Sequence, residues 1–172
     1  MKEKKSFSNI VITFAILYGI LAILLSLIKT PTTDPKDTIA VILGFVGLFV
    51  FIGIFVLAVK YYKDQGYKVF IGTGIKLGVL AGLLGGLIAG IYSYIYFAYL
   101  HPEMIDQVLE MSRKILEEND MFDQEMLEQQ METSRKIFLP MQIGGQIFSG
   151  LIYGLIGGLL GGVFYKTARE DY

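Results

Sequence analysis

Few side chains in this 172-residue sequence have the types and spacing that catalysis or metal binding requires. The chain has no cysteine and one histidine, His101, which excludes thiolate nucleophiles, disulfides and multi-histidine metal sites. His101 lies beside Pro102 and Glu103, and one histidine with one carboxylate is a poor metal site. No phosphate-binding loop and no plausible Ser/His/Asp set accompanies it. We therefore expect no catalytic residue, no metal ion, no cofactor and no enzymatic activity.

Lys76 is the only ionisable side chain well inside a long apolar segment. At the centre of a membrane helix a lysine costs about 2.5–3.5 kcal/mol and usually marks function. Lys76 lies only two turns past Lys68, however, so its long side chain can reach lipid headgroups. The apolar segments contain no Asp or Glu, which argues against a proton- or sodium-coupled carrier. For Gln142, Gln146 and Ser149 we expect interhelical hydrogen bonds rather than an ion path.

The composition that surrounds these residues indicates a membrane protein. Hydrophobic residues make up 53% of the chain, glycine contributes 20 more positions, and only 18% of residues are charged. Mean hydropathy is +0.55. Soluble domains have about 45–50% apolar residues with glycine included. The values exclude a disordered chain, a nucleic-acid binder with a basic field and an ordinary water-soluble enzyme.

Four apolar segments are long enough to cross a bilayer, which needs about 20 helical residues. They predict an all-α, polytopic membrane protein that forms a single membrane domain over residues 1–172. The predicted transmembrane helices lie at about residues 10–28, 39–59, 70–98 and 143–165.

The first of these segments also resembles a cleaved signal peptide, because Lys2, Lys4 and Lys5 form a basic start. Its apolar stretch is longer than a usual signal-peptide core, and no A-x-A-like site precedes Lys29-Thr30-Pro31. We expect a retained signal-anchor helix.

Between the third and fourth spans the composition changes. Residues 102–140 contain ten acidic and four basic residues, a net charge of −6. Pro102 suits the first position of a helix, and Asp123 is a plausible N-cap for a second helix over residues 124–138. We predict an acidic helical hairpin outside the membrane at residues 102–139, with a single long bent helix as the alternative.

The distribution of basic residues predicts the orientation. With the N-terminus inside, the inner segments hold eight Lys and Arg residues and the outer segments six. Because basic residues near membrane ends favour the cytoplasm, we expect both termini to be cytoplasmic and the hairpin to be extracytoplasmic.

The glycines form two rows with a strict four-residue spacing, the pattern of a glycine zipper. Such spacing places them along one helix face, which lets another backbone approach closely in lipid. The pattern does not say whether the rows pack within one chain or drive self-association. The rows are Gly74, Gly78, Gly82, Gly86 and Gly90 in the third span, and Gly150, Gly154, Gly158 and Gly162 in the fourth.

The order of parts resembles a known family. After two spans comes a short loop rich in Lys, Tyr and Gly (Tyr61–Lys68), then a glycine-rich span that ends near Tyr99 and Pro102-Glu103. An acidic helical segment and a glycine-rich last span follow. This arrangement resembles the bacterial four-helix membrane family called domain of unknown function 4199, of Bacteroidetes type. The resemblance implies a multi-pass protein of the bacterial inner (cytoplasmic) membrane, and it implies no catalytic residues.

On this basis we expect a non-enzymatic binding or assembly component. Its expected partners are membrane lipids and either a second copy of the chain or an envelope protein, and we expect no nucleic acid. A small channel or carrier for lipid or a small solute is one alternative. An accessory subunit of an envelope enzyme for lipid-linked sugars is another.

Overall fold

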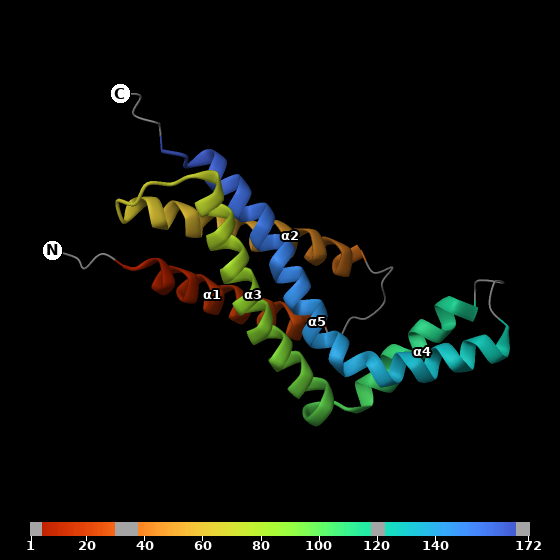
Figure 1. Ribbon diagram of the computed structural model, residues 1–172. Helices are drawn as coiled ribbons and strands as arrows, with labels where there is room; N and C mark the ends of the chain where they lie inside the picture. Colours follow the sequence, from red (N-terminus) through yellow and green to blue (C-terminus); the bar gives the residue numbers. More distant parts are fainter. Residues whose placement is uncertain (1–4, 30–37, 118–122, 168–172) are drawn as a thin grey trace. The chain divides into compact units, whose positions relative to one another are not determined.

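The computed structural model describes residues 5–29, 38–117 and 123–167, and these residues form helices without any strand. The all-α fold class is therefore as expected. The helices are α1 (Phe7–Lys29), α2 (Thr38–Asp64), α3 (Ile71–Ile95), the π-helical turn η1 (Tyr96–Leu100), α4 (Glu103–Glu117) and α5 (Gln124–Phe164) (Figure 1).

In the described part of the chain, four helices are long and apolar enough to cross a membrane: α1, α2, α3 with η1, and α5. Their large apolar side chains are often directed outward, and Phe45, Phe49 and Phe164 are 64%, 70% and 70% exposed. In water such faces would be a liability, whereas in lipid they match the solvent. A helix also satisfies its own backbone hydrogen bonds, which a bilayer requires of any spanning segment.

The chain divides into two compact units. The first unit comprises residues 1–89 and 146–172, with α1, α2, most of α3 and the C-terminal part of α5. The second unit comprises residues 90–145, with the end of α3, η1, α4 and the N-terminal part of α5.

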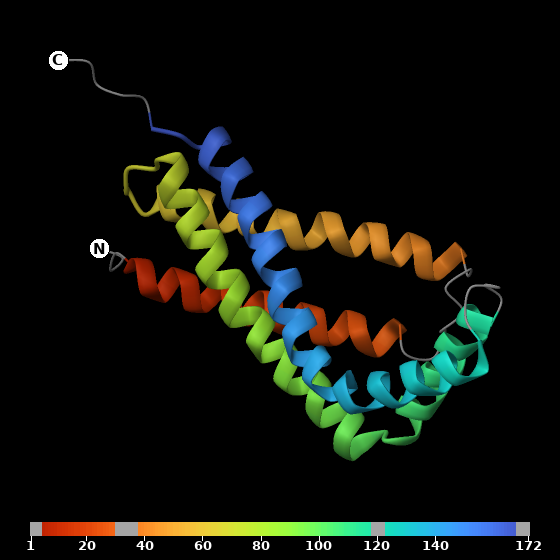
Figure 2. The same cartoon turned by 45° about the vertical axis from the view of Figure 1, so that its right-hand side comes forward.

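In the first unit α1 and α2 are antiparallel neighbours (Figure 2). Contacts between aromatic side chains connect the two helices. The rings of Phe7 and Tyr62 meet edge to face at 5.8 Å. Tyr18 lies 5.0 Å from Phe51 and 5.2 Å from Phe55, measured between ring centroids. The buried core around these rings consists of Ile10, Val11, Ala15, Tyr18, Ile54, Phe55, Ala58, Leu77 and Ala81.

Hydrogen bonds connect the α2–α3 loop to the segment that follows α5. The turn after α2 places Gly66 at φ 79°, a conformation that glycine adopts without strain. Val69 N donates to Thr167 Oγ1 at 2.9 Å, and Thr167 N donates to the Val69 carbonyl oxygen at 2.9 Å. The N-terminal segment reaches the same loop, since Lys5 N donates to Gln65 Oε1 at 3.2 Å.

In the second unit α4 lies against the N-terminal part of α5, as both views show (Figures 1 and 2). Arg135 Nη2 pairs with Asp106 Oδ1 at 2.9 Å across the two helices. At the start of α5, Met126 N donates to Asp123 Oδ1 at 2.8 Å, which confirms Asp123 as the N-cap. The expected helical hairpin is thus present, and Leu109 is among its buried residues.

The expected break between the hairpin and the last span is absent. We expected one helix over 124–138 and a separate span from 143, but α5 is continuous and contains Pro140. A proline removes one backbone hydrogen bond and costs about 3 kcal/mol inside a helix. Helices in apolar surroundings tolerate this loss because ending the helix would expose several backbone groups instead of one.

Candidate functional site

The two predicted glycine rows face each other along antiparallel helices. A methyl group at Gly74 would lie 2.5 Å from the Gly158 carbonyl oxygen. Gly78 faces Gly154 in the same way, and Gly82 faces Gly150, with even less room. Backbone therefore touches backbone along this contact, which lies within one chain.

Two members of the rows have other neighbours. A methyl group at Gly86 would lie 2.5 Å from the Gln146 carbonyl oxygen. One at Gly90, in the second unit, would lie 2.9 Å from Ile143 Cα. The contact thus continues past the last glycine pair, because the α3 side still lacks a side chain.

A second set of glycines, which the four-residue rows do not include, brings the other two long helices close. Gly85 lies against α1, where a methyl group would be 2.6 Å from the Ala15 carbonyl oxygen. Gly157 and Gly161 lie against α2, with Ile52 and Val59 among the nearest residues. The signal for these contacts is the Gly-Gly doublet, since adjacent helical residues face different sides.

Lys76 lies on α3 with its side chain exposed, away from the glycine contact. This position is compatible with headgroup contact. Among the described residues no group of three or more His, Asp or Glu side chains could hold a metal ion.

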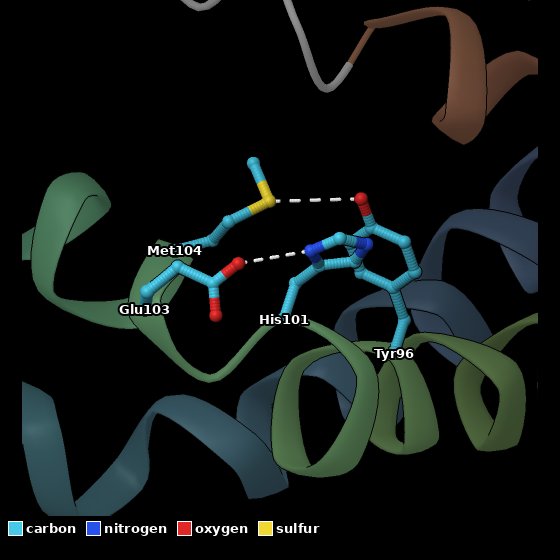
Figure 3. Close-up of polar contacts among 4 residues, drawn as sticks. All are labelled: Tyr96, His101, Glu103 and Met104. Atoms are coloured by element: carbon cyan, nitrogen blue, oxygen red, sulfur yellow. Dashed lines mark hydrogen bonds and ion pairs between the residues drawn. The ribbon is translucent and has the colours of Figure 1, made fainter.

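His101 follows η1 and joins a small polar cluster at the start of α4 (Figure 3). Its Nδ1 lies 2.9 Å from Glu103 Oε1, and its ring lies 4.8 Å from the ring of Tyr96. The Tyr96 hydroxyl donates to Met104 Sδ at 3.6 Å. The hydrogen bond from the His101 side chain holds the pKa of the Glu103 carboxyl below its ordinary value, and a backbone hydrogen bond contributes less to the same shift.

The hairpin carries a groove of about 400 Å³ between α4 and α5. Leu109 and Met131 supply its apolar part. Its charged rim consists of Asp106, Glu110, Glu132, Arg113 and Arg135.

The uncharged polar residues of the last span differ from expectation. Within the described residues, the side chains of Gln142, Gln146 and Ser149 have no interhelical hydrogen bond. Gln146 and Ser149 instead line a cavity together with Tyr18 and Tyr153. Sequence reasoning missed both tyrosines, because each looks like one more aromatic residue in an apolar helix.

Four candidate spans with glycine contacts between them define a multi-pass membrane protein of helical-bundle type. The chain belongs to the family described as protein of unknown function (DUF4199), whose model matches residues 13–167. This match confirms the family resemblance. No curated protein matches the chain significantly, and no solved structure does.

Replacing Gly78 with alanine should destabilise the bundle, because the new methyl group would meet the Gly154 backbone. We expect a lower melting temperature in mild detergent, measured by the loss of soluble protein on heating. Gly72→Ala on the same helix is the matched control, since nothing lies within 4 Å of that site. The control should be neutral or gain up to about 1 kcal/mol from helix propensity. Equal melting temperatures for the two variants would contradict the contact.

Replacing His101 with alanine should raise the pKa of Glu103 toward its ordinary value, because the side-chain hydrogen bond that lowers this pKa most is removed. A carboxyl whose pKa is lowered by folding stabilises the fold at pH values above its unfolded-state pKa. That stabilisation disappears as the pH falls through its folded-state pKa. Side-chain carbon NMR of labelled glutamate measures the midpoint. The control variant Gln130→Ala, at an exposed position of α5, should leave the titration midpoint of Glu103 unchanged. An unchanged midpoint in the His101 variant would show that His101 does not lower the pKa of Glu103.

Proposed function

We propose that this chain is a non-enzymatic binding component of the bacterial inner membrane. Both termini lie in the cytoplasm, and the α4–α5 hairpin recognises a partner on the other side. The observation that carries the proposal is the groove of the hairpin, which combines an apolar floor with a charged rim on α4 and on the N-terminal part of α5.

The basic residues at one end of the first unit support the orientation. The N-terminal segment, the α2–α3 loop and the segment after α5 are linked there by hydrogen bonds. Basic residues near membrane ends favour the cytoplasm. If each candidate span crosses once, the hairpin after α3 lies on the opposite side. The exposed basic residues of this end are Lys5, Lys60, Lys63, Lys68 and Lys166.

The charge of the hairpin supports a partner with a basic surface. Residues 102–140 carry a net charge of −6. The Asp106–Arg135 pair satisfies one acidic and one basic group of the rim internally. The carboxylates of Glu110 and Glu132 also line the groove, and among the described residues each pairs with one exposed lysine of its own helix. Such exposed pairs contribute little to stability, so the carboxylates can exchange them for a partner's cations.

The groove shape supports a helical segment or a loop with one apolar anchor. Leu109 is buried at its base and Met131 is partly buried beside it. An apolar anchor in a small pocket with charges at the rim is the usual anatomy of a specific protein contact. The partner could be a second copy of this chain or another envelope protein, and the experiment below distinguishes them.

Cysteine labelling tests the orientation without background, because the chain has no cysteine. Gln107→Cys on α4 should react with a membrane-impermeant maleimide in cells whose outer membrane is permeabilised. Asp64→Cys, at the end of α2, should react only after the inner membrane is broken. Both positions are exposed, so access through the membrane decides the result. The reverse pattern would overturn the proposed orientation.

Removing the two groove carboxylates should release the partner. The double variant Glu110→Gln/Glu132→Gln should lose crosslinked partner in native membranes roughly ten-fold or more, since each charge-assisted hydrogen bond is worth about 1.5–3 kcal/mol. Crosslinked co-purification of the full chain measures this, and mass spectrometry identifies a second copy or a different protein.

The matched control is Glu125→Gln/Glu128→Gln, which removes the same charge from the same hairpin outside the groove. It should retain the crosslinked partner. Equal loss in both variants would mean that net charge acts without a groove, and no loss in either would refute the groove as the binding site.

A further inference from the structure

A cavity of about 190 Å³ lies among α1, α2 and α5 in the first unit. One ordered water needs about 10–15 Å³ by this kind of measure, so the cavity can hold several waters or one small solute. Its polar lining comes from Tyr18, Ser26, Gln146, Ser149 and Tyr153. It is separate from the α3–α5 glycine contact, where no such space remains.

Tyr18 is the most buried of these residues. It is 1% exposed, and its hydroxyl has no hydrogen bond to another described residue. Among the described residues, no side-chain polar atom that is sealed from solvent lacks a partner. The Tyr18 hydroxyl is therefore open to the cavity that it lines. The Tyr18 ring fits there because two neighbouring residues have no side chain. A methyl group at Gly85 would lie 2.6 Å from the ring, and one at Gly150 would lie 3.2 Å from it.

Aromatic rings form one side of the cavity. Phe51 lies edge to face with Tyr18 at 5.0 Å and stacks on Tyr153 at 5.5 Å. Binding sites for small molecules commonly combine such apolar walls with a few fixed polar groups.

The cavity extends along α1 and α5. Tyr18 lies near the middle of the candidate span Phe7–Ile28, and Ser26 lies eight residues further, about 12 Å along the helix. On antiparallel α5, Tyr153 and Gln146 are seven residues apart, about 10 Å. The polar lining thus runs from mid-span toward the end of α1.

The lining restricts the chemistry of an occupant. The described residues that line it include no acidic, basic or histidine side chain, so a charged ligand would lose its hydration without gaining a counter-charge. A purely apolar ligand would leave the Tyr18 hydroxyl and the Gln146 amide without partners. A neutral ligand with several hydroxyl groups can both donate to and accept from these groups.

We infer that this cavity binds a neutral polyhydroxyl group the size of glycerol or a single sugar. The group can come from a neutral glycolipid in the bilayer or from a free polyol in water. The inference goes beyond the proposed hairpin function and does not depend on it, since every lining residue belongs to the first unit.

The test uses the full chain in phosphatidylcholine nanodiscs. In the lipid arm, the discs also contain monoglucosyldiacylglycerol, and native mass spectrometry measures the retained lipid. In the water arm, saturation-transfer NMR measures glycerol binding. The variant Tyr18→Phe/Tyr153→Phe keeps both rings and removes two hydroxyls. This variant should weaken binding roughly ten- to thirty-fold in whichever arm the parent protein binds its ligand, the glycolipid or glycerol.

Tyr92→Phe/Tyr99→Phe is the matched control, because it removes two hydroxyls outside the cavity. It should bind as the parent does. Ser149→Val provides a second cavity variant if the tyrosine variant does not fold. Loss of glycolipid or of glycerol in the cavity variants supports the inference and identifies the source. Equal retention of phosphatidylcholine and glycolipid together with no glycerol binding would overturn it, and so would equal binding by the parent and the cavity variants.

Discussion

Helices in lipid gain nothing from hiding apolar surface from each other, because the lipid is equally apolar. What can hold them together is close contact, and α3 and α5 reach it by having no side chains where they meet. The carbonyl oxygens of Gly150, Gly154 and Gly158 occupy the places that methyl groups would take on α3. Contacts of Cα–H groups with such oxygens contribute about 0.5–1 kcal/mol each. Within the first unit, α1 and α2 pack against these two helices at Gly85, Gly157 and Gly161.

The glycine doublets extend the same principle to two sides of one helix. Gly85 faces α1 while its neighbour Gly86 faces α5, and Gly157 faces α2 while Gly158 faces α3. Close packing at these contacts contrasts with the cavity that Tyr18 lines among α1, α2 and α5. The bundle is therefore dense where glycines meet and open where tyrosine, serine and glutamine side chains gather.

The fold followed from the sequence where a local rule decides it. Segment length and hydropathy predicted the four long helices, and the cap at Asp123 followed from residue type. The predicted break after residue 138 was wrong, because α5 continues through Pro140, whose cost depends on surroundings that the sequence does not specify. The glycine spacing predicted close packing but not the partner helix. The cavity escaped prediction because it needs Tyr18 and Tyr153, which lie 135 positions apart and meet only through tertiary packing.

The position of α5 at the end of the chain has a consequence for biosynthesis. Gly154 is made more than seventy residues after Gly78, its partner on α3. At about 5–20 residues per second, α3 waits several seconds with that glycine face against lipid. The other face of α3 can pack at once, because Gly85 contacts α1, which is synthesised before α3. Assembly can therefore begin with α1 holding α3, and the arrival of α5 completes the bundle.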